Sequence, residues 1–194
     1  VTDTEVKKLL NENPFVIDQE KLPEEAELKL IASALTIKKV VKSKKINNVI
    51  SFHGRVNRAR VFSKGLKNID KEFYLNEFHV NGKQSGTLRQ RILSEFSQKS
   101  PSIVTNARCL SEGVDIPSVD AVIFVDPKQS KISITQAIGR ALRKPKDQKK
   151  GMSYIIIPTI INTKNSKDIE EAYQEILMVL RSISEHDGRI VEYF

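Results

Sequence analysis

Residues 102–125, SIVTNARCLSEGVDIPSVDAVIFV, decide the fold, because two short β-rich runs flank a polar stretch that contains Gly113 and Pro117. The two runs are Ser102–Thr105 and Ala121–Val125. Apolar runs that are bounded by turns are typical of strands buried on both faces of a parallel sheet. The segment therefore predicts a strand, a short helix that ends at Gly113, a turn that closes at Pro117, and a second buried strand.

The same alternation extends to both sides of this segment. Further strands are predicted at Asn48–Phe52, Glu77–Val80 and Ser153–Ile157, and helices at Leu28–Val41, Val56–Leu66, Leu88–Phe96, Ile132–Arg143 and Ile169–Ile183. Strands that alternate with helices predict one α/β domain with a mainly parallel sheet. We expect a helical lead-in at 1–46, the α/β lobe at 47–160, and a helical extension at 161–194 packed on the lobe. The last helix carries an apolar stripe that predicts core packing, with a partner-facing role as the alternative; its members are Ile169, Ala172, Tyr173, Ile176, Leu180 and Ile183.

Composition excludes several classes of protein. With 39% hydrophobic and 29% charged residues in 194, the chain is neither disordered nor of low complexity. Its one cysteine, Cys109, cannot form an internal disulfide, and with three histidines it does not suggest a zinc cluster, so no metal site is predicted. The apolar runs are far shorter than the roughly 18 residues of a membrane span. We expect a cytoplasmic protein with no membrane partner, and the start at Val1 suggests a piece of a longer chain.

Basic residues are concentrated in two tracts. Ten lysines and arginines and no acid lie between Lys38 and Ile69, and eight bases against one acid lie between Lys128 and Lys150. Both ends of the chain are acidic by comparison. Basic tracts on an apolar scaffold favour a polyanion as partner, and a solvated lysine-rich face is the alternative.

The helix predicted at Ile132–Arg143 has two different sides. Its apolar residues, Ile138 among them, fall on one side, and Gln136, Gly139, Arg140 and Arg143 fall on the other. Two guanidinium groups and one amide on a single helix face are suited to bind phosphate oxygens. A surface helix with arginines is the alternative, but it leaves unexplained a mid-helix glycine that costs about 1 kcal/mol relative to alanine.

Polar residues stand where predicted strands end. Thr105 and Asn106 close one strand, and Asp115 lies in the following turn. Ligands of open parallel sheets bind at the C-terminal ends of the strands, so these three residues are candidate ligand contacts. Helix and turn capping is the alternative for each of them.

No P-loop is found in the sequence. The nearest stretch is Gly82–Ser85, which lacks the preceding glycine and the Ser or Thr after the lysine, so it is interpreted as a strand-to-helix loop. Asp126 ends an apolar run, but it cannot form a Walker-type magnesium site by itself.

The stretch from Thr105 to Pro127, followed by QAIGRALR at 136–143, resembles motifs V and VI of superfamily 2 helicases and translocases. Residues 49–62, VISFHGRVNRARVF, look like the motif IV strand and helix, and residues 79–96 look like the turn and helix before motif V. The resemblance covers roughly Asn48–Pro158, the second RecA-like lobe of such a motor. It implies a three-layer RecA-like fold of the P-loop NTPase type, with helices on both faces of the sheet.

The resemblance also implies roles for individual residues. Arg140 and Arg143 match the arginine fingers that stabilise charge on the γ-phosphate of ATP, and Gln136 matches the first residue of that motif and should lie near the same phosphates. Gly113, Asp115 and Gly139 match positions near the nucleotide. Residues that match nucleic-acid contacts are Thr105, Asn106, His53, Gly54, Arg55 and Arg58; for His53 a structural histidine is the alternative.

The resemblance predicts the second motor lobe of an ATP-dependent nucleic-acid helicase or translocase. ATP and Mg²⁺ would be bound mainly by an N-terminal lobe of the same polypeptide, so the 194 residues alone should be inactive. DNA is favoured over RNA because Gln136 and Ala137 stand where RNA helicases have His-Arg. A free-standing, non-enzymatic nucleic-acid-binding lobe is the alternative, and a small-molecule enzyme is disfavoured because no G-x-G-x-x-G follows the first strand.

Overall fold

A five-stranded sheet forms the centre of the molecule. The computed structural model describes residues 4, 6–8, 24–69, 74–107, 109, 119–126, 138, 153–159 and 166–184. The strands are β1 (Asn48–Phe52), β2 (Asn76–Asn81), β3 (Ser102–Ala107), β4 (Ala121–Phe124) and β5 (Tyr154–Ile156), and the helices are α2 (Glu24–Lys44), α3 (Val56–Ile69), α4 (Gly86–Gln98) and α6 (Ser166–Ser184). The strand order is β2-β3-β1-β4-β5, and every pair is parallel.

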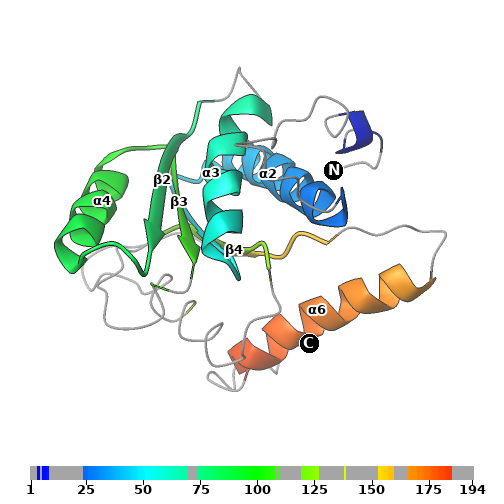
Figure 1. The fold of residues 1–194 in the computed structure, drawn as a ribbon. Coiled ribbons are helices and arrows are strands. Elements are labelled where there is room, and N and C mark those ends of the chain that lie inside the picture. The colour runs from blue at the N-terminus through cyan, green and yellow to red at the C-terminus, as the bar shows by residue number, and fades with distance from the viewer. Residues whose placement is uncertain are drawn as a thin grey trace.

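Helices cover both faces of the sheet, so the sequence-predicted α/β class with its parallel sheet is confirmed. Alternate residues of β1 point to opposite faces: Val49 joins the cluster formed with α2 and α3, and Ile50 joins the cluster formed with α4 and α6. Figure 1 shows the sheet between α4 on one side and α3 on the other. Buried strands of this kind are apolar on both faces, which explains the continuous apolar runs in the sequence.

The predicted strands are confirmed, with small differences in length. β3 is two residues longer than predicted, so that Asn106 and Ala107 still pair with Val80 and Asn81 of β2. Of the predicted helix Ile132–Arg143, only Ile138 lies among the described residues. It is helical and 9% exposed, which confirms its predicted position on the apolar side.

Local signals in the sequence set two helix ends. Ser85 caps α4, because its hydroxyl oxygen accepts a hydrogen bond from the backbone N–H of Leu88 at 3.2 Å. α2 ends where Lys45 adopts a left-handed backbone conformation with φ 52° and Ile46 N donates to Val41 O. This is a Schellman-type end, in which glycine is the usual residue at the position of Lys45.

The stripe predicted for α6 is partly wrong. Tyr173 is 59% exposed, whereas Val179, which the stripe omits, is fully buried against the face that α4 also covers. Ile183 of the stripe packs against the same cluster as Val179, so the prediction departs from the structure in including Tyr173 and omitting Val179. The predicted domain divisions at 46/47 and 160/161 stay predictions, although α2 contributes residues to the same core cluster as the strands. Among the described helices, none is long and apolar enough to cross a bilayer.

The basic tract from Lys38 to Ile69 is not a single surface. The exposed Lys42, Lys44 and Lys45 lie at the end of α2, next to the start of β1, whereas Arg55 and Arg60 follow the end of β1. The two groups therefore flank opposite edges of the sheet, separated by a five-residue strand. Strand β1 interrupts the tract, so its lysines and its arginines do not form one continuous surface.

Candidate functional site

The C-terminal edge of the sheet gathers most of the described candidate residues. β1, β3 and β4 end side by side, since Phe52 pairs with Asn106 on one side and with Phe124 on the other. The ladder continues for one more residue on each side, where His53 N donates to Asn106 O and Val125 N donates to Phe52 O. The residues that follow these strands are therefore held close together.

An ion pair ties the turn after β1 to the end of β4. Arg58 Nη1 lies 2.7 Å from Asp126 Oδ1, and the backbone N–H of Gly54 donates to Asp126 Oδ2 at 3.0 Å. The Arg58 side chain is 33% exposed and that of Asp126 is 14% exposed. A guanidinium and a backbone N–H just before the first turn of α3 form a binding site for an anion, and Asp126 occupies it with a carboxylate.

His53 is fully buried and directly precedes Gly54. Its Nε2 lies 3.1 Å from Ser51 Oγ, its ring lies 4.9 Å from that of Phe62, and its Nδ1 has no hydrogen-bond partner among the described residues. Burial lowers the pKa of His53 to about 3, although the charge of Asp126 opposes the shift. His53 is therefore a neutral internal residue, which fits the structural alternative noted for it.

Thr105 is also buried, and its hydroxyl is engaged within the protein. It donates to the carbonyl of Phe78 at 3.2 Å and accepts from His79 Nδ1 at 2.8 Å. His79 Nε2 in turn lies 3.1 Å from Asn81 Nδ2. These bonds are consistent with a neutral His79, and burial together with the Arg60 guanidinium lowers the pKa of this histidine.

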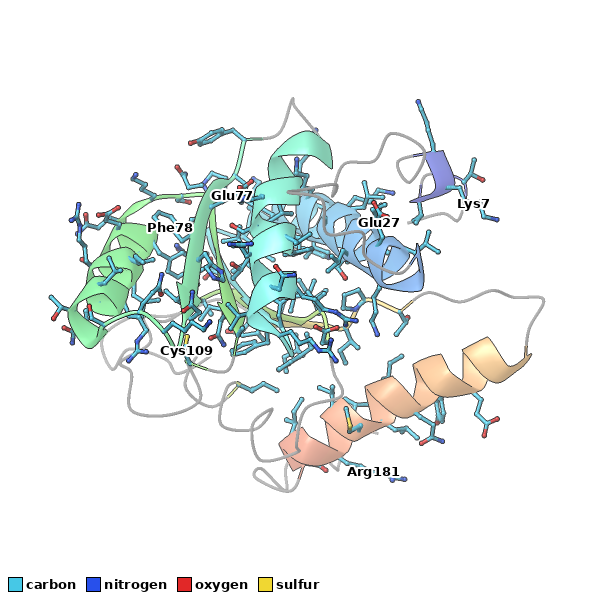
Figure 2. The ribbon with its side chains drawn as sticks, viewed as in Figure 1. Lys7, Glu27, Glu77, Phe78, Cys109 and Arg181 are labelled. Atoms are coloured by element: carbon cyan, nitrogen blue, oxygen red, sulfur yellow. The ribbon has the colours of Figure 1, made fainter. Side chains whose placement is uncertain are left out.

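Asn106 shapes the chain that leaves β3. Its Oδ1 accepts hydrogen bonds from the Cys109 backbone N–H at 3.1 Å and from Cys109 Sγ at 3.0 Å, and only 1% of the residue is exposed. Figure 2 shows Cys109 just beyond the ends of β2 and β3. Burial raises the pKa of the Cys109 thiol to about 11, so this cysteine is not a reactive thiolate. The geometry corresponds to the turn-capping alternative for Asn106.

A pocket of about 450 Å³ opens between α3 and the turn from β2 to α4. Its lining is polar and basic and consists of Val56, Asn57, Arg60, His79, Asn81, Lys83 and Gln84. The turn is rigidly bonded, because Asn81 N donates to Gln84 Oε1 and Lys83 N donates to Asn81 Oδ1, both at 2.9 Å. The interpretation of Gly82–Ser85 as a strand-to-helix loop is thereby confirmed.

Most of these lining residues were not singled out in the sequence. Residues 79–96 were matched to the turn and helix before motif V, but no role was assigned to His79 or Asn81, and Arg60 is one base among ten. The available signal was the Asn-Gly step at 81–82, which marks a turn at the end of a strand.

The candidate residues for ATP lie outside the described part of the chain. They are Arg140, Arg143, Gln136, Gly139, Gly113 and Asp115. Of the residues predicted to contact nucleic acid, Gly54 and the exposed Arg55 lie in the turn after β1 and the half-buried Arg58 lies in the first turn of α3, whereas His53, Thr105 and Asn106 are buried.

The chain matches the family described as the helicase conserved C-terminal domain over residues 32–145. It is 33% identical over 109 residues to the African swine fever virus protein named probable helicase A859L, a match that covers 54% of this chain and 12% of the viral protein. It is 36% identical over 63 residues to the ATP-dependent rRNA helicase spb4 of Aspergillus clavatus, covering 32% of this chain and 10% of that protein. The chain thus spans about an eighth or less of the length of these relatives.

Solved structures share its fold. The ATP-dependent Type ISP restriction-modification enzyme LlaBIII bound to DNA superposes with a TM-score of 0.77 at 22% identity, covering 96% of this chain and 13% of that enzyme. The C-terminal part of the Fun30 ATPase domain gives 0.56 at 18% identity over 97% of this chain and 64% of that structure. Domain 2 of the DEAD-box helicase Mss116p bound to an RNA duplex gives 0.50 at 20% identity, covering 80% and 65%. The three-layer fold is accordingly the RecA-like one.

Proposed function

The chain belongs to the helicase conserved C-terminal domain family, and on that premise we propose that it is the second motor lobe of an ATP-dependent nucleic-acid helicase or translocase. An N-terminal lobe of the same polypeptide makes most of the contacts to ATP and its Mg²⁺. Arg140 and Arg143 reach that nucleotide across the cleft between the lobes, with Gln136, Gly139, Gly113 and Asp115 nearby. The protein acts in the cytoplasm.

One observation supports the nucleic-acid role most strongly: donors for anions gather at the C-terminal edge of the sheet, and Arg55 and Arg60 among them are exposed. Gly54 and Arg58 present a backbone N–H and a guanidinium, Arg55 is exposed beside them, and Arg60 and Lys83 line the adjoining pocket. A row of such donors fits the regularly spaced phosphates of a nucleic-acid backbone.

The buried candidates have a different part in this proposal. Thr105, Asn106 and His53 bond to neighbouring protein groups and position the exposed turns, and Gly54, Arg55 and Arg58 make the contacts. This division follows from burial, because a side chain that is 0–1% exposed has no surface to offer a ligand.

DNA is the favoured track. Gln136 and Ala137 occupy the positions where RNA helicases have His-Arg. Anisotropy of labelled DNA and RNA single strands of the same sequence tests this preference, and tighter binding of RNA would contradict it.

The motor role is tested in the complete polypeptide that contains this lobe. Arg140→Ala and Arg143→Ala are each expected to lower nucleic-acid-stimulated ATP hydrolysis by about 10³-fold, with ATP binding nearly unchanged. Arg181→Ala, at an exposed position on α6, is the matched control and should hydrolyse ATP normally. Normal hydrolysis in both finger variants would favour the non-enzymatic lobe, and robust turnover by residues 1–194 alone would refute the two-lobe proposal.

A further inference from the structure

Two aspartates bracket β4, and each bonds to one end of β1. At the N-terminal edge, Asp120 Oδ2 accepts from the backbone N–H of Asn47 at 2.8 Å and of Asn48 at 3.3 Å. At the C-terminal edge, Asp126 Oδ2 accepts from Gly54 N at 3.0 Å. Asp126 differs in that its second oxygen also pairs with Arg58.

The groups that face Asp126 are those that bind phosphate in other proteins. The backbone N–H of Gly54 lies just before the 14-residue helix α3, and Arg58 lies in the first turn of that helix. A helix N-terminus and a guanidinium both favour an anion, and a phosphate oxygen satisfies the same donors as a carboxylate oxygen. Asp126 therefore occupies the position that a backbone phosphate would take.

We propose that Asp126 is the counter-ion of Arg58 when the lobe is free, and that a nucleic-acid phosphate replaces it when the lobe binds its track. This inference rests on the proposed function, since it assigns Arg58 to nucleic-acid contact. Asp126 is then a positioning residue that acts through Arg58. By competing with the phosphate, it lowers the affinity of the lobe for nucleic acid.

The exchange keeps the guanidinium paired in both states. Arg58 is two-thirds buried, and a buried charge without a partner is costly. With Asp126 present, release of a phosphate leaves Arg58 neutralised, so release is easier than it would be from an unpaired arginine. A motor lobe that must release its track in every cycle benefits from such an internal anion.

A buried histidine, His53, directly precedes Gly54 in the sequence. Its Nδ1 has no hydrogen-bond partner in the part of the chain that the structure describes. The charge of Asp126 already acts on this ring, since it raises the pKa of His53 against the effect of burial. The Asp126 carboxylate and the His53 ring are therefore electrostatically coupled.

The test measures the anisotropy of a fluorescein-labelled single-stranded oligo-dT with the 194-residue chain over a series of salt concentrations. Asp126→Asn keeps an acceptor for Gly54 N and removes the charge. If Arg58 is paired with Asp126 in most of the free molecules, the affinity for the oligonucleotide should rise about threefold to tenfold. Asp120→Asn removes the same charge at the opposite edge and should change affinity by less than about twofold. In the Arg58→Gln background, Asp126→Asn should give no gain.

The outcomes separate this inference from the proposed function. Salt-dependent binding by the wild type without a gain in Asp126→Asn overturns the inference alone, as does a gain that persists in Arg58→Gln, because the effect would then be a general one of charge. Absence of salt-dependent binding by the wild type overturns the proposed function. Thermal melting verifies that each variant is folded, and Asp126→Ser is the second neutral variant, for which the same gain is expected.

Discussion

The two edges of the sheet are built from the same strands but have different surfaces. At the N-terminal edge, side chains form hydrogen bonds with one another and with the backbone. Asn48 Nδ2 lies 2.7 Å from Ser102 Oγ and 3.0 Å from Phe96 O, and Ser100 Oγ lies 3.0 Å from Asn47 Oδ1. At the C-terminal edge lie a partly exposed ion pair, a buried histidine nitrogen without a partner among the described residues, and a pocket.

The difference follows from the direction of the chain. In a parallel sheet every strand enters from one edge and leaves at the other, where the helices that follow begin. Helix N-termini present backbone N–H groups and positive partial charge, so the edge where strands end attracts anions. Helix C-termini lie at the opposite edge and carry negative partial charge. Lys42 and Lys44, in the last turn of α2, complement that charge. The lysines of this basic tract therefore complement a helix C-terminus, whereas its arginines lie at the edge that attracts anions.

The largest expected effect concerns the buried histidine of the C-terminal edge. The unfolded chain protonates His53 near its ordinary pKa of 6.5, whereas the folded chain keeps it neutral down to a pKa of about 3. The stability that depends on neutral His53 is thus complete above pH 6.5 and is lost as the pH falls towards 3. Between pH 7 and pH 5 the free energy of unfolding should fall by about 2 kcal/mol, as measured by urea denaturation.

His53→Gln is the matched variant for this measurement. It should be less stable than the wild type at pH 7 but should lose most of the pH dependence between pH 7 and pH 5. A small dependence of the same sign remains, because His79 also has a lowered pKa. An equally steep dependence in the variant would show that other groups cause it.

The next effect separates the two edges by nucleic-acid binding. The double variant Arg55→Ala, Arg60→Ala should weaken oligonucleotide binding about tenfold and reduce the salt slope by about 0.7 for each lost phosphate contact. Lys42→Ala, Lys44→Ala removes the same charge from the end of α2 and should weaken binding by less than about threefold, through the general field alone. Equal losses in the two double variants, measured by anisotropy, would contradict the assignment of binding to one edge.

The smallest effect lies at the N-terminal edge. Lys45 adopts φ 52°, a left-handed conformation that is costly for a residue with a Cβ. Lys45→Gly should therefore raise the free energy of unfolding by about 0.5–1 kcal/mol. Lys42→Gly, three residues earlier and within the last turn of the helix, should lower it by a similar amount. Chemical denaturation of the two variants tests the contrast, which fails if both changes have the same sign.

Strand positions were predictable because burial on both faces leaves a strong signal. β1 was predicted with its observed bounds, and β4 within one residue, since runs such as VISF and AVIF have few alternatives. The packing side of α6 was predicted only in part, since Ile183 packs on the core cluster but several apolar residues around the helix allow more than one stripe. Only the contact with the sheet selects Val179 over Tyr173.

The candidate site was predictable in place but not in detail. Motif resemblance indicated Gly54, Arg55, Arg58, Thr105 and Asn106, and all five lie at the C-terminal edge. It did not indicate that Thr105 is bonded to His79, 26 residues away in sequence, because no local pattern links two residues on neighbouring strands. Nor did it show which candidates are exposed, which depends on how the loops and helices cover each strand end.

The sequence by itself determined the parallel α/β architecture, the order of its elements and the family, because hydrophobic periodicity and motif spacing are local properties of the chain. Only the tertiary structure decided that Asp126 pairs with Arg58, 68 positions away, and that one basic tract serves two opposite edges. The physical reason is that the partner of a charged side chain depends on which groups lie near it in the folded protein, and these can be far away in sequence. Strand β1 is short in sequence, but it separates two surfaces whose helix termini have opposite polarity.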